Sequence, residues 1–195
     1  ALLLGVFPVC HADTLLLFDF EDANGNFDLS AELAADALDP ETRTVLSSSI
    51  RDFGGNPERA MASSGFGTGN SFQLVVAINP GSIVELSGFA FDQLASSSGP
   101  SDWTLDINGT SVASGSTTTA FANENGLFGF EPLSDTFTIG LSGSGASSNR
   151  GTFRVDNFAI TGTIQPVPLH ASLGLFSVAG LSLAACPRRR LKLRV

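Results

Sequence analysis

Between residues 13 and 165 the sequence contains no cysteine, histidine, tyrosine or lysine. The two cysteines, Cys10 and Cys186, and the two histidines, His11 and His170, lie near the ends of the chain. This central segment therefore lacks a disulfide framework, a thiolate or imidazole zinc site and a Ser-His-Asp or Cys-His catalytic centre. A carboxylate pair of the glycosidase type remains, but among nineteen acidic residues some pair lies close by chance. The sequence predicts that the protein is not an enzyme.

Positive charge is equally scarce in the central segment. All nineteen Asp and Glu residues lie between Asp13 and Asp156, whereas five of the ten Lys and Arg residues lie in the C-terminal tail. Residues 13–165 thus carry a formal charge of 5 − 19 = −14. Such a surface repels nucleic acid and anionic lipid and attracts cations, so no nucleic-acid partner is expected.

The end of the chain combines an apolar run with a basic terminus. Residues 169–186 carry no charged side chain and, at about 1.5 Å per residue, would form a helix of roughly 27 Å, enough to cross a membrane. Five Arg and Lys residues follow within 188–194. This excess of positive charge predicts a cytoplasmic C-terminus. A plain membrane anchor and a buried core helix are the alternatives, although a core helix rarely ends in five cations.

This tail resembles the PEP-CTERM sorting signal in its Val-Pro-Leu-Pro-Ala variant, with a short motif, an apolar span and an arginine cluster in that order. The motif is Val167, Pro168, Leu169, His170 and Ala171, and the cluster begins with Arg188, Arg189 and Arg190. His170 departs from the usual proline. The resemblance implies an exported bacterial protein, anchored transiently in the inner membrane through residues 166–195. An exosortase would then process the tail and leave the product at the cell surface or outside the cell, often beside extracellular polysaccharide.

The first twelve residues are apolar and resemble the end of a secretory signal peptide. Small residues at Cys10 and Ala12 predict cleavage before Asp13. In the alternative lipoprotein interpretation Cys10 would be acylated, but Phe7, Pro8 and Val9 are a poor lead-in to such a site. We therefore expect residues 1–12 to be a signal-peptide remnant and residues 13–165 to be the exported domain.

The central segment has the two-residue period of β-strands. Strands are predicted at 14–20, 72–79, 83–91, 102–107, 136–141 and 152–164, separated by turns such as Asn79-Pro80-Gly81 and Asn108-Gly109. The pattern predicts an all-β, antiparallel sandwich, with jelly-roll topology preferred, followed by the C-terminal transmembrane helix. Residues 30–38 are interpreted as a short helix or a loop, and residues 53–70 as a long surface loop.

The last predicted strand contains a break in parity. Val155 and Phe158 would face opposite sides of a regular strand, so a β-bulge near Asp156 or Asn157 is needed if both are to reach the core. Together with the acidic end of the first strand, this pattern resembles carbohydrate-binding jelly rolls that hold a structural Ca²⁺. The resemblance implies Glu21 and Asp156 as ligands, with Asp19, Asp22 and Asn157 as weaker candidates. In the alternative, these carboxylates are merely solvated or paired with Arg150 or Arg154.

Two functions compete for the exported domain. The first is a non-catalytic structural or adhesive role at the cell surface or in the extracellular matrix. The alternative is a carbohydrate-binding, lectin-like module, which could be stabilised by calcium. Sugar platforms usually expose aromatic faces, yet Trp103 alternates with Leu105 and Ile107 and is predicted to lie in the core.

Overall fold

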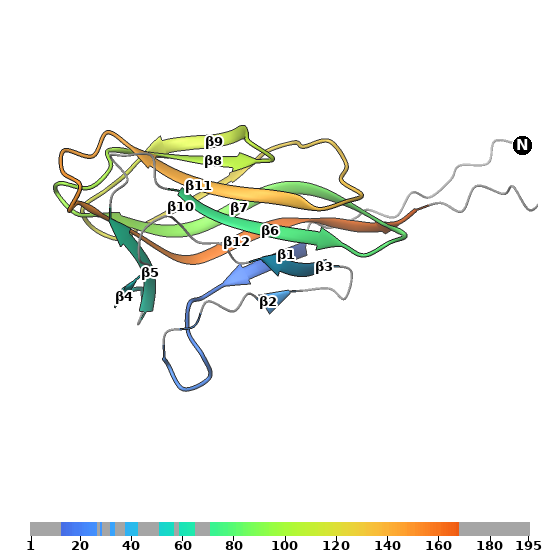
Figure 1. Cartoon of the computed structure of the whole chain (residues 1–195), viewed down its shortest axis with the longest axis horizontal. Coiled ribbons are helices and arrows are strands. Elements are labelled where there is room, and N and C mark those ends of the chain that lie inside the picture. The colour runs from blue at the N-terminus through green and yellow to red at the C-terminus, as the bar shows by residue number, and fades with distance from the viewer. Residues whose placement is uncertain are drawn as a thin grey trace, which may run out of the picture.

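In the computed structural model, residues 13–26, 28, 32–33, 38–42, 51–56, 59–64 and 71–167 are described. They form two antiparallel sheets packed as a sandwich (Figure 1). The strands are β1 (Asp13–Phe18), β2 (Glu32–Leu33), β3 (Leu38–Thr42), β4 (Arg51–Gly54), β5 (Arg59–Ser64), β6 (Ser71–Ile78), β7 (Ser82–Ala95), β8 (Asp102–Ile107), β9 (Thr110–Ser116), β10 (Ala122–Leu127), β11 (Phe137–Ser144) and β12 (Thr152–Pro166). No helix occurs in these ranges. The prediction of an all-β antiparallel sandwich is confirmed.

The two sheets differ in size and composition. One is seven-stranded, with the order β10-β7-β12-β1-β2 and with β5 also paired to β12 and β4 to β5. The other is five-stranded, with the order β3-β6-β11-β8-β9. The long strands β7 and β12 lie side by side and form the spine of the larger sheet (Figure 1). The candidate ligand Asp156 lies in β12 itself, and Glu21 follows β1, which pairs with β12.

Alternating apolar side chains from both sheets fill the space between them. Phe91 of β7 and Trp103 of β8 meet edge to face with ring centroids 5.0 Å apart, so the contact joins one sheet to the other. Trp103 is only 3% exposed, which confirms its predicted place in the core. Edge-to-face aromatic pairs contribute beyond their area of burial, and the contact fixes the spacing of the sheets locally.

The predicted turns have the backbone conformations that their residues favour. Asn108 and Gly109 both have positive φ, 51° and 75°, as a two-residue hairpin between β8 and β9 requires. Gly81 has φ of 90° after Pro80, and Ser82 donates its backbone N–H to the carbonyl of Asn79. Both turns are therefore confirmed.

Two loop predictions were wrong. Within 30–38, Glu32–Leu33 pairs with β1 as a short strand and Leu38 begins β3, so neither the helix nor the loop interpretation describes these residues. Within 53–70, β5 is a strand with buried Ala60, Met61 and Ala62, paired to β12 on one side and β4 on the other. Small side chains and flanking Gly and Pro residues conceal this hairpin in the sequence, because it lacks large alternating apolar residues.

The predicted end segments fall mostly outside the described residues. The signal-peptide remnant, residues 1–12, and the tail from Pro168 to Val195 are not among them. Within the described ranges there is no helix that is both long enough and apolar enough to span a membrane. Of the sorting motif, Val167 alone is described: it follows β12, is 40% exposed and donates its backbone N–H to the Gly81 carbonyl.

Candidate functional site

Three carboxylates from distant parts of the chain come together beside the spine of the larger sheet. We call Glu21, Asp92 and Asp156 the acidic cluster. Asp92 of β7 and Asp156 of β12 are direct partners in the strand register, and the charges of Asp92 and Glu21 both act on Asp156. The structure therefore brings together the two residues, Glu21 and Asp156, that the resemblance to carbohydrate-binding jelly rolls implies.

Asp156 owes its position to the predicted bulge. The register between β12 and β7 shifts between Asp156 and Ala159, and Asn157 adopts a left-handed φ of 48°. Val155 and Phe158 are both buried as a result, which confirms the parity argument. The Asp156 side chain accepts hydrogen bonds from the backbone N–H groups of Asn56 (2.6 Å) and Asn157 (2.9 Å) and is only 1% exposed.

Burial dominates the electrostatics of Asp156. Removal from water raises the pKa of its carboxyl to about 6, and the negative charges of Asp92 and Glu21 act in the same direction. The two backbone N–H groups oppose the rise because they stabilise the charged form. Asp156 is thus a carboxyl group whose ionisation at neutral pH costs folding free energy.

Asp92 is surrounded by asparagine side chains. It is 8% exposed and accepts from Nδ2 of Asn123 at 2.9 Å and from Nδ2 of Asn157 at 3.0 Å. A longer contact of 3.5 Å comes from Nδ2 of Asn56. Asn157 also donates to the Asn56 carbonyl at 2.9 Å, so its side chain ties β12 to the turn between β4 and β5. All these donors are neutral amides.

The end of β1 delivers Glu21 to the same place. Phe20 has a φ of 61°, a conformation that is strained for a bulky side chain, and its ring is buried against Phe18 with centroids 5.8 Å apart. The chain therefore turns sharply at Phe20, and Glu21 accepts the backbone N–H of Arg59 at 2.7 Å. The packing of Phe20 against Phe18 thus holds a strained backbone conformation that positions the Glu21 carboxylate.

The weaker ligand candidates have different roles. Asp19 accepts the N–H of Glu21 at 3.2 Å, and Asp22 accepts the N–H groups of Asn24 and Asn26, each at 2.8 Å. Hydrogen bonds from Asn26 and Asn24 lower the pKa of Asp22. Asp22 thus organises the turn after β1.

No cation neutralises the acidic cluster among the described residues, in which the single ion pair joins Arg59 to Asp52 at 2.7 Å. Arg154 donates to the Gly54 carbonyl at 3.2 Å and lies over the ring of Phe53, 4.7 Å from its centroid. The alternative in which Arg154 pairs with Asp156 is therefore wrong. Amide N–H groups alone offset the charge.

The donor set has the chemistry of a calcium site, because carboxylate and amide oxygens are the ligands this hard cation prefers. The ligand shell that a calcium ion requires is not assembled in this structure. Among the described residues no three His, Cys, Asp or Glu side chains are arranged to hold a metal ion. Both Asp156 oxygens already accept N–H groups, so a bound cation would have to compete with hydrogen bonds from Asn56 and Asn157.

The sequence argument missed Asp92 and Asn56. Asp92 could have been noticed as a charged residue inside the apolar run of β7, where Phe91 and Gln93 beside it are fully buried. Asn56 lies in a segment interpreted as a surface loop, and no local pattern in the sequence reveals that its N–H faces a residue one hundred positions away.

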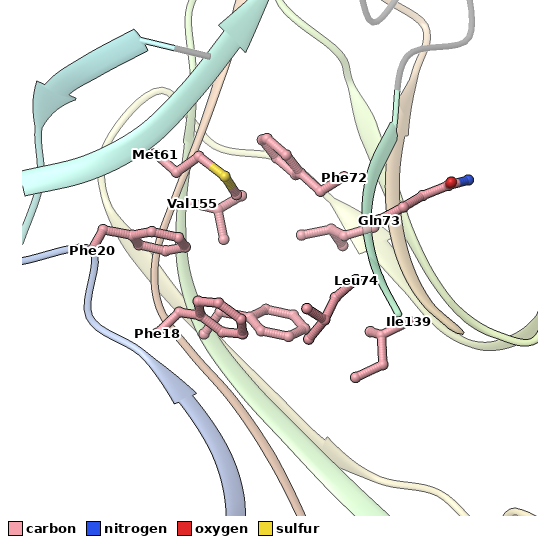
Figure 2. A pocket seen from close by; sticks show the side chains of 10 residues that line it. Phe18, Phe20, Met61, Phe72, Gln73, Leu74, Ile139 and Val155 are labelled. Atoms are coloured by element: carbon pink, nitrogen blue, oxygen red, sulfur yellow. The ribbon is translucent and has the colours of Figure 1, made fainter. Parts of the chain in front are cut away.

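A small apolar cavity adjoins the cluster between the sheets (Figure 2). It has a volume of about 50 Å³, and Phe20 and Val155 in its wall directly precede Glu21 and Asp156. Gln73 contributes to the lining, but its amide points away from the cavity in Figure 2. A space of this size and polarity suits neither a sugar nor a metal ion.

Comparisons with known proteins find carbohydrate-binding modules among the similar solved structures, all at low identity and low TM-score. No family model matches the sequence, and no curated protein matches it. A mutant of the family 29 module CBM29-2 in complex with mannohexaose has 14% identity and a TM-score of 0.44, covering 78% of this chain and 93% of that one. The module CBM36 in complex with calcium and xylotriose has 13% identity and a TM-score of 0.39, with 60% and 97% covered.

A third similar structure is the CBM36-1 domain of a multidomain xylanase from the hindgut metagenome of Trinervitermes trinervoides. It has 14% identity and a TM-score of 0.42, with 61% of this chain and 95% of that one covered. At such values the function of the chain has to be argued from its own residues.

Proposed function

We propose that this chain is an exported, non-catalytic module that binds extracellular polysaccharide and is stabilised by calcium. The observation that carries the proposal is the meeting of Glu21 and Asp156 at the spine of the larger sheet, with Asp92 beside Asp156 on β7, the neighbour of β12 on the side away from β1. That pair was implied by the resemblance to carbohydrate-binding jelly rolls. Its proximity supports the resemblance, because the two residues are 135 positions apart in the sequence.

In this proposal Glu21, Asp92 and Asp156 hold the cation, with carbonyl and amide oxygens of Asn56 and Asn157 as further ligands. Calcium would supply the positive charge that the surrounding residues lack. The chain's own residues fix the carboxylates: the bulge at Asn157 aims Asp156, and the left-handed turn at Phe20 aims Glu21. The cation's effect would be structural, joining β1, β12 and the turn between β4 and β5.

Thermal unfolding of the full chain tests the calcium part. Wild type should melt at a higher temperature in millimolar Ca²⁺ than in chelator, and Asp156→Ala should show no such difference. A matched control is Asp135→Ala, which removes an exposed carboxylate away from the acidic cluster and should retain the response. Equal wild-type melting temperatures in calcium and chelator would end this part of the proposal.

Export and sorting form the second part of the proposal. The signal-like start and the PEP-CTERM-like tail support delivery to the cell exterior, with transient anchoring in the inner membrane and processing by an exosortase-type enzyme. Intact mass of the protein recovered outside the cell tests both cleavages at once. A mass that begins at Asp13 and ends near the 167–171 motif is expected, and a cytosolic full-length species would contradict it.

A structural or adhesive role without a glycan ligand is the competing function. The burial of Trp103 favours it, because the domain's single Trp is unavailable as an exposed sugar platform. Affinity gel electrophoresis against soluble polysaccharides separates the two. Retarded migration in any of them supports the binding module, and uniform migration in all of them supports the structural role.

A further inference from the structure

A groove is formed by the first half of β7, the last part of β12 and the chain after β10. Its volume is about 380 Å³, within the range of small-ligand sites. Its lining includes Glu85, Ser87, Phe128, Phe130, Thr163 and Gln165. Val84 and Leu86 of β7 are buried in the core, whereas Glu85 between them is exposed, so the groove opens toward solvent.

One wall is an arch of the chain after β10. Phe128 donates its N–H to the Ser87 carbonyl at 3.0 Å, and Leu133 exchanges two backbone hydrogen bonds of 2.8 Å with Val84. Between these anchors the arch has four residues, 129–132, whereas β7 has only two, 85 and 86. The surplus must rise away from the edge of β7. The arch therefore forms a wall that is fixed at both ends.

The floor is a second β-bulge. Gly88 pairs with Thr161 and Leu86 with Gly162, so Ser87 between them has no partner in the ladder. A Cβ at Gly162 would overlap the Glu85 carbonyl, and one at Gly88 would lie 2.8 Å from Oγ1 of Thr161. Side chains at these two positions would disrupt the bulge. Bulges often lie next to functional sites, where they re-aim side chains.

The lining combines aromatic and polar groups. Phe128 and Phe130 are half-buried and pack against the core, and the ring of Phe128 stacks on Phe89 with centroids 6.4 Å apart. Their positions are therefore fixed before any ligand arrives.

The polar groups of the groove have free hydrogen-bonding capacity. Within the described part of the chain, the side chains of Glu85, Thr163 and Gln165 have no protein hydrogen-bond partner, and the buried Oγ of Ser87 has none either. The Ser87 Oγ is shielded from solvent, so the groups that can meet a ligand are those of Glu85, Thr163 and Gln165. Glu85 is the one charged residue in the lining, so the groove attracts hydroxyl donors and repels anions.

From these observations we propose that the groove binds one sugar ring of a neutral polysaccharide. The C–H face of the ring would pack on Phe130 and Phe128, and its hydroxyls would hydrogen-bond to Glu85, Gln165 and Thr163. An anionic polysaccharide is disfavoured by Glu85 and by the charge of −14 on residues 13–165. This inference rests on the proposed polysaccharide-binding function and assigns its site.

The test uses affinity gel electrophoresis of the full chain with hydroxyethylcellulose, xylan and galactomannan as neutral probes and alginate as the anionic probe. The double variant E85Q/Q165A changes two partly or fully exposed groove residues. The matched control is Gln73→Ala, which removes an exposed amide from the other sheet. Phe130→Ala tests the aromatic wall, with its melting curve recorded to confirm folding.

Wild type should be retarded by at least one neutral probe, and the double variant should lose about tenfold in association constant, as expected when the hydrogen bond of Gln165 is lost and that of Glu85 is weakened by the removal of its charge. Gln73→Ala should behave as wild type. Neutral-probe binding that E85Q/Q165A leaves unchanged would overturn the site and leave the proposed function standing. Binding to alginate alone would overturn the neutral-ligand inference. Failure of every probe to bind would instead overturn the proposed function itself.

Discussion

Asp156 makes the stability of the protein depend on pH in a direction opposite to that of carboxylates that are paired with a cation in the folded state. Asp156 has a pKa of about 6 when folded, against 3.8 for an unperturbed aspartate. Between these values the folded state binds more protons than the unfolded state, so stability falls as pH rises. The loss begins near pH 4 and is complete above pH 6. The difference of about two pH units corresponds to about 3 kcal/mol of unfolding free energy.

Asp156→Asn removes the charge while keeping the shape of the side chain. The amide keeps one oxygen acceptor for the two N–H groups of Asn56 and Asn157, so one hydrogen bond is lost at a cost of about 1 kcal/mol. In chelator at pH 7 the variant should therefore exceed wild type in unfolding free energy by about 2 kcal/mol. At pH 4, where Asp156 is protonated in the folded state and only partly protonated in the unfolded state, the variant should be slightly less stable than wild type, because the lost hydrogen bond then outweighs the cost of ionisation.

Urea denaturation in chelator at pH 4, 5, 6 and 7 measures this crossing of the two stability curves. Repulsion among the many surface carboxylates also varies with pH, so the quantity of interest is the difference between variant and wild type. Asp135→Asn, at an exposed position, supplies the control difference, which should stay flat. A variant-minus-wild-type difference that does not change between pH 4 and 7 would refute the reasoning. Added calcium should reverse the order at pH 7, because it stabilises only a charged Asp156.

Three further predictions concern packing. Gly55→Ala would overlap the Arg59 carbonyl and approach Asp156 Oδ2 to 2.5 Å, and should lower the unfolding free energy by about 3 kcal/mol in urea titration, whereas Gly54→Ala meets nothing within 4 Å and should not. Gln93→Leu leaves the N–H of Thr118 without its side-chain acceptor at 3.2 Å and should cost about 1–3 kcal/mol by the same assay. Trp103 fluorescence should be blue-shifted and unchanged by any bound polysaccharide, because its ring is buried between the sheets; a glycan-induced shift would contradict this.

Local pattern was sufficient to predict most of the sandwich. The strand predicted at 102–107 and the one at 152–164 coincide with β8 and with most of β12, because large apolar residues alternate with polar ones along them. The hairpin β4–β5 was missed for the converse reason. Its buried side chains include Ala60 and Ala62, which carry no strong strand signal and are held in place by pairing to β12.

Only the part of the candidate site at which the backbone departs from regular strand geometry could be predicted from the sequence. The parity break between Val155 and Phe158 requires a bulge whatever the rest of the fold, and the bulge identified Asp156. Asp92 enters the cluster through strand register, which a single sequence does not define. The groove at β7 depends on the same kind of information, since its arch and its bulge are visible only once Ser87 is paired with Phe128.

The position of the acidic cluster explains how a fold with so little positive charge can tolerate three buried or half-buried carboxylates. Asp92 and Asp156 lie on β7 and β12, whose long antiparallel ladder holds them in place irrespective of their repulsion. Glu21 and Asn56 lie outside this ladder, after the end of β1 and in the turn between β4 and β5. Glu21 accepts the N–H of Arg59, and Asn56 donates its N–H to Asp156 and accepts from Nδ2 of Asn157. Repulsion therefore acts mainly on these peripheral segments. A cation bound there would tighten these segments onto a spine that is already stable, so its loss should loosen the residues after β1 and the turn between β4 and β5 before the core, to which β1 itself belongs.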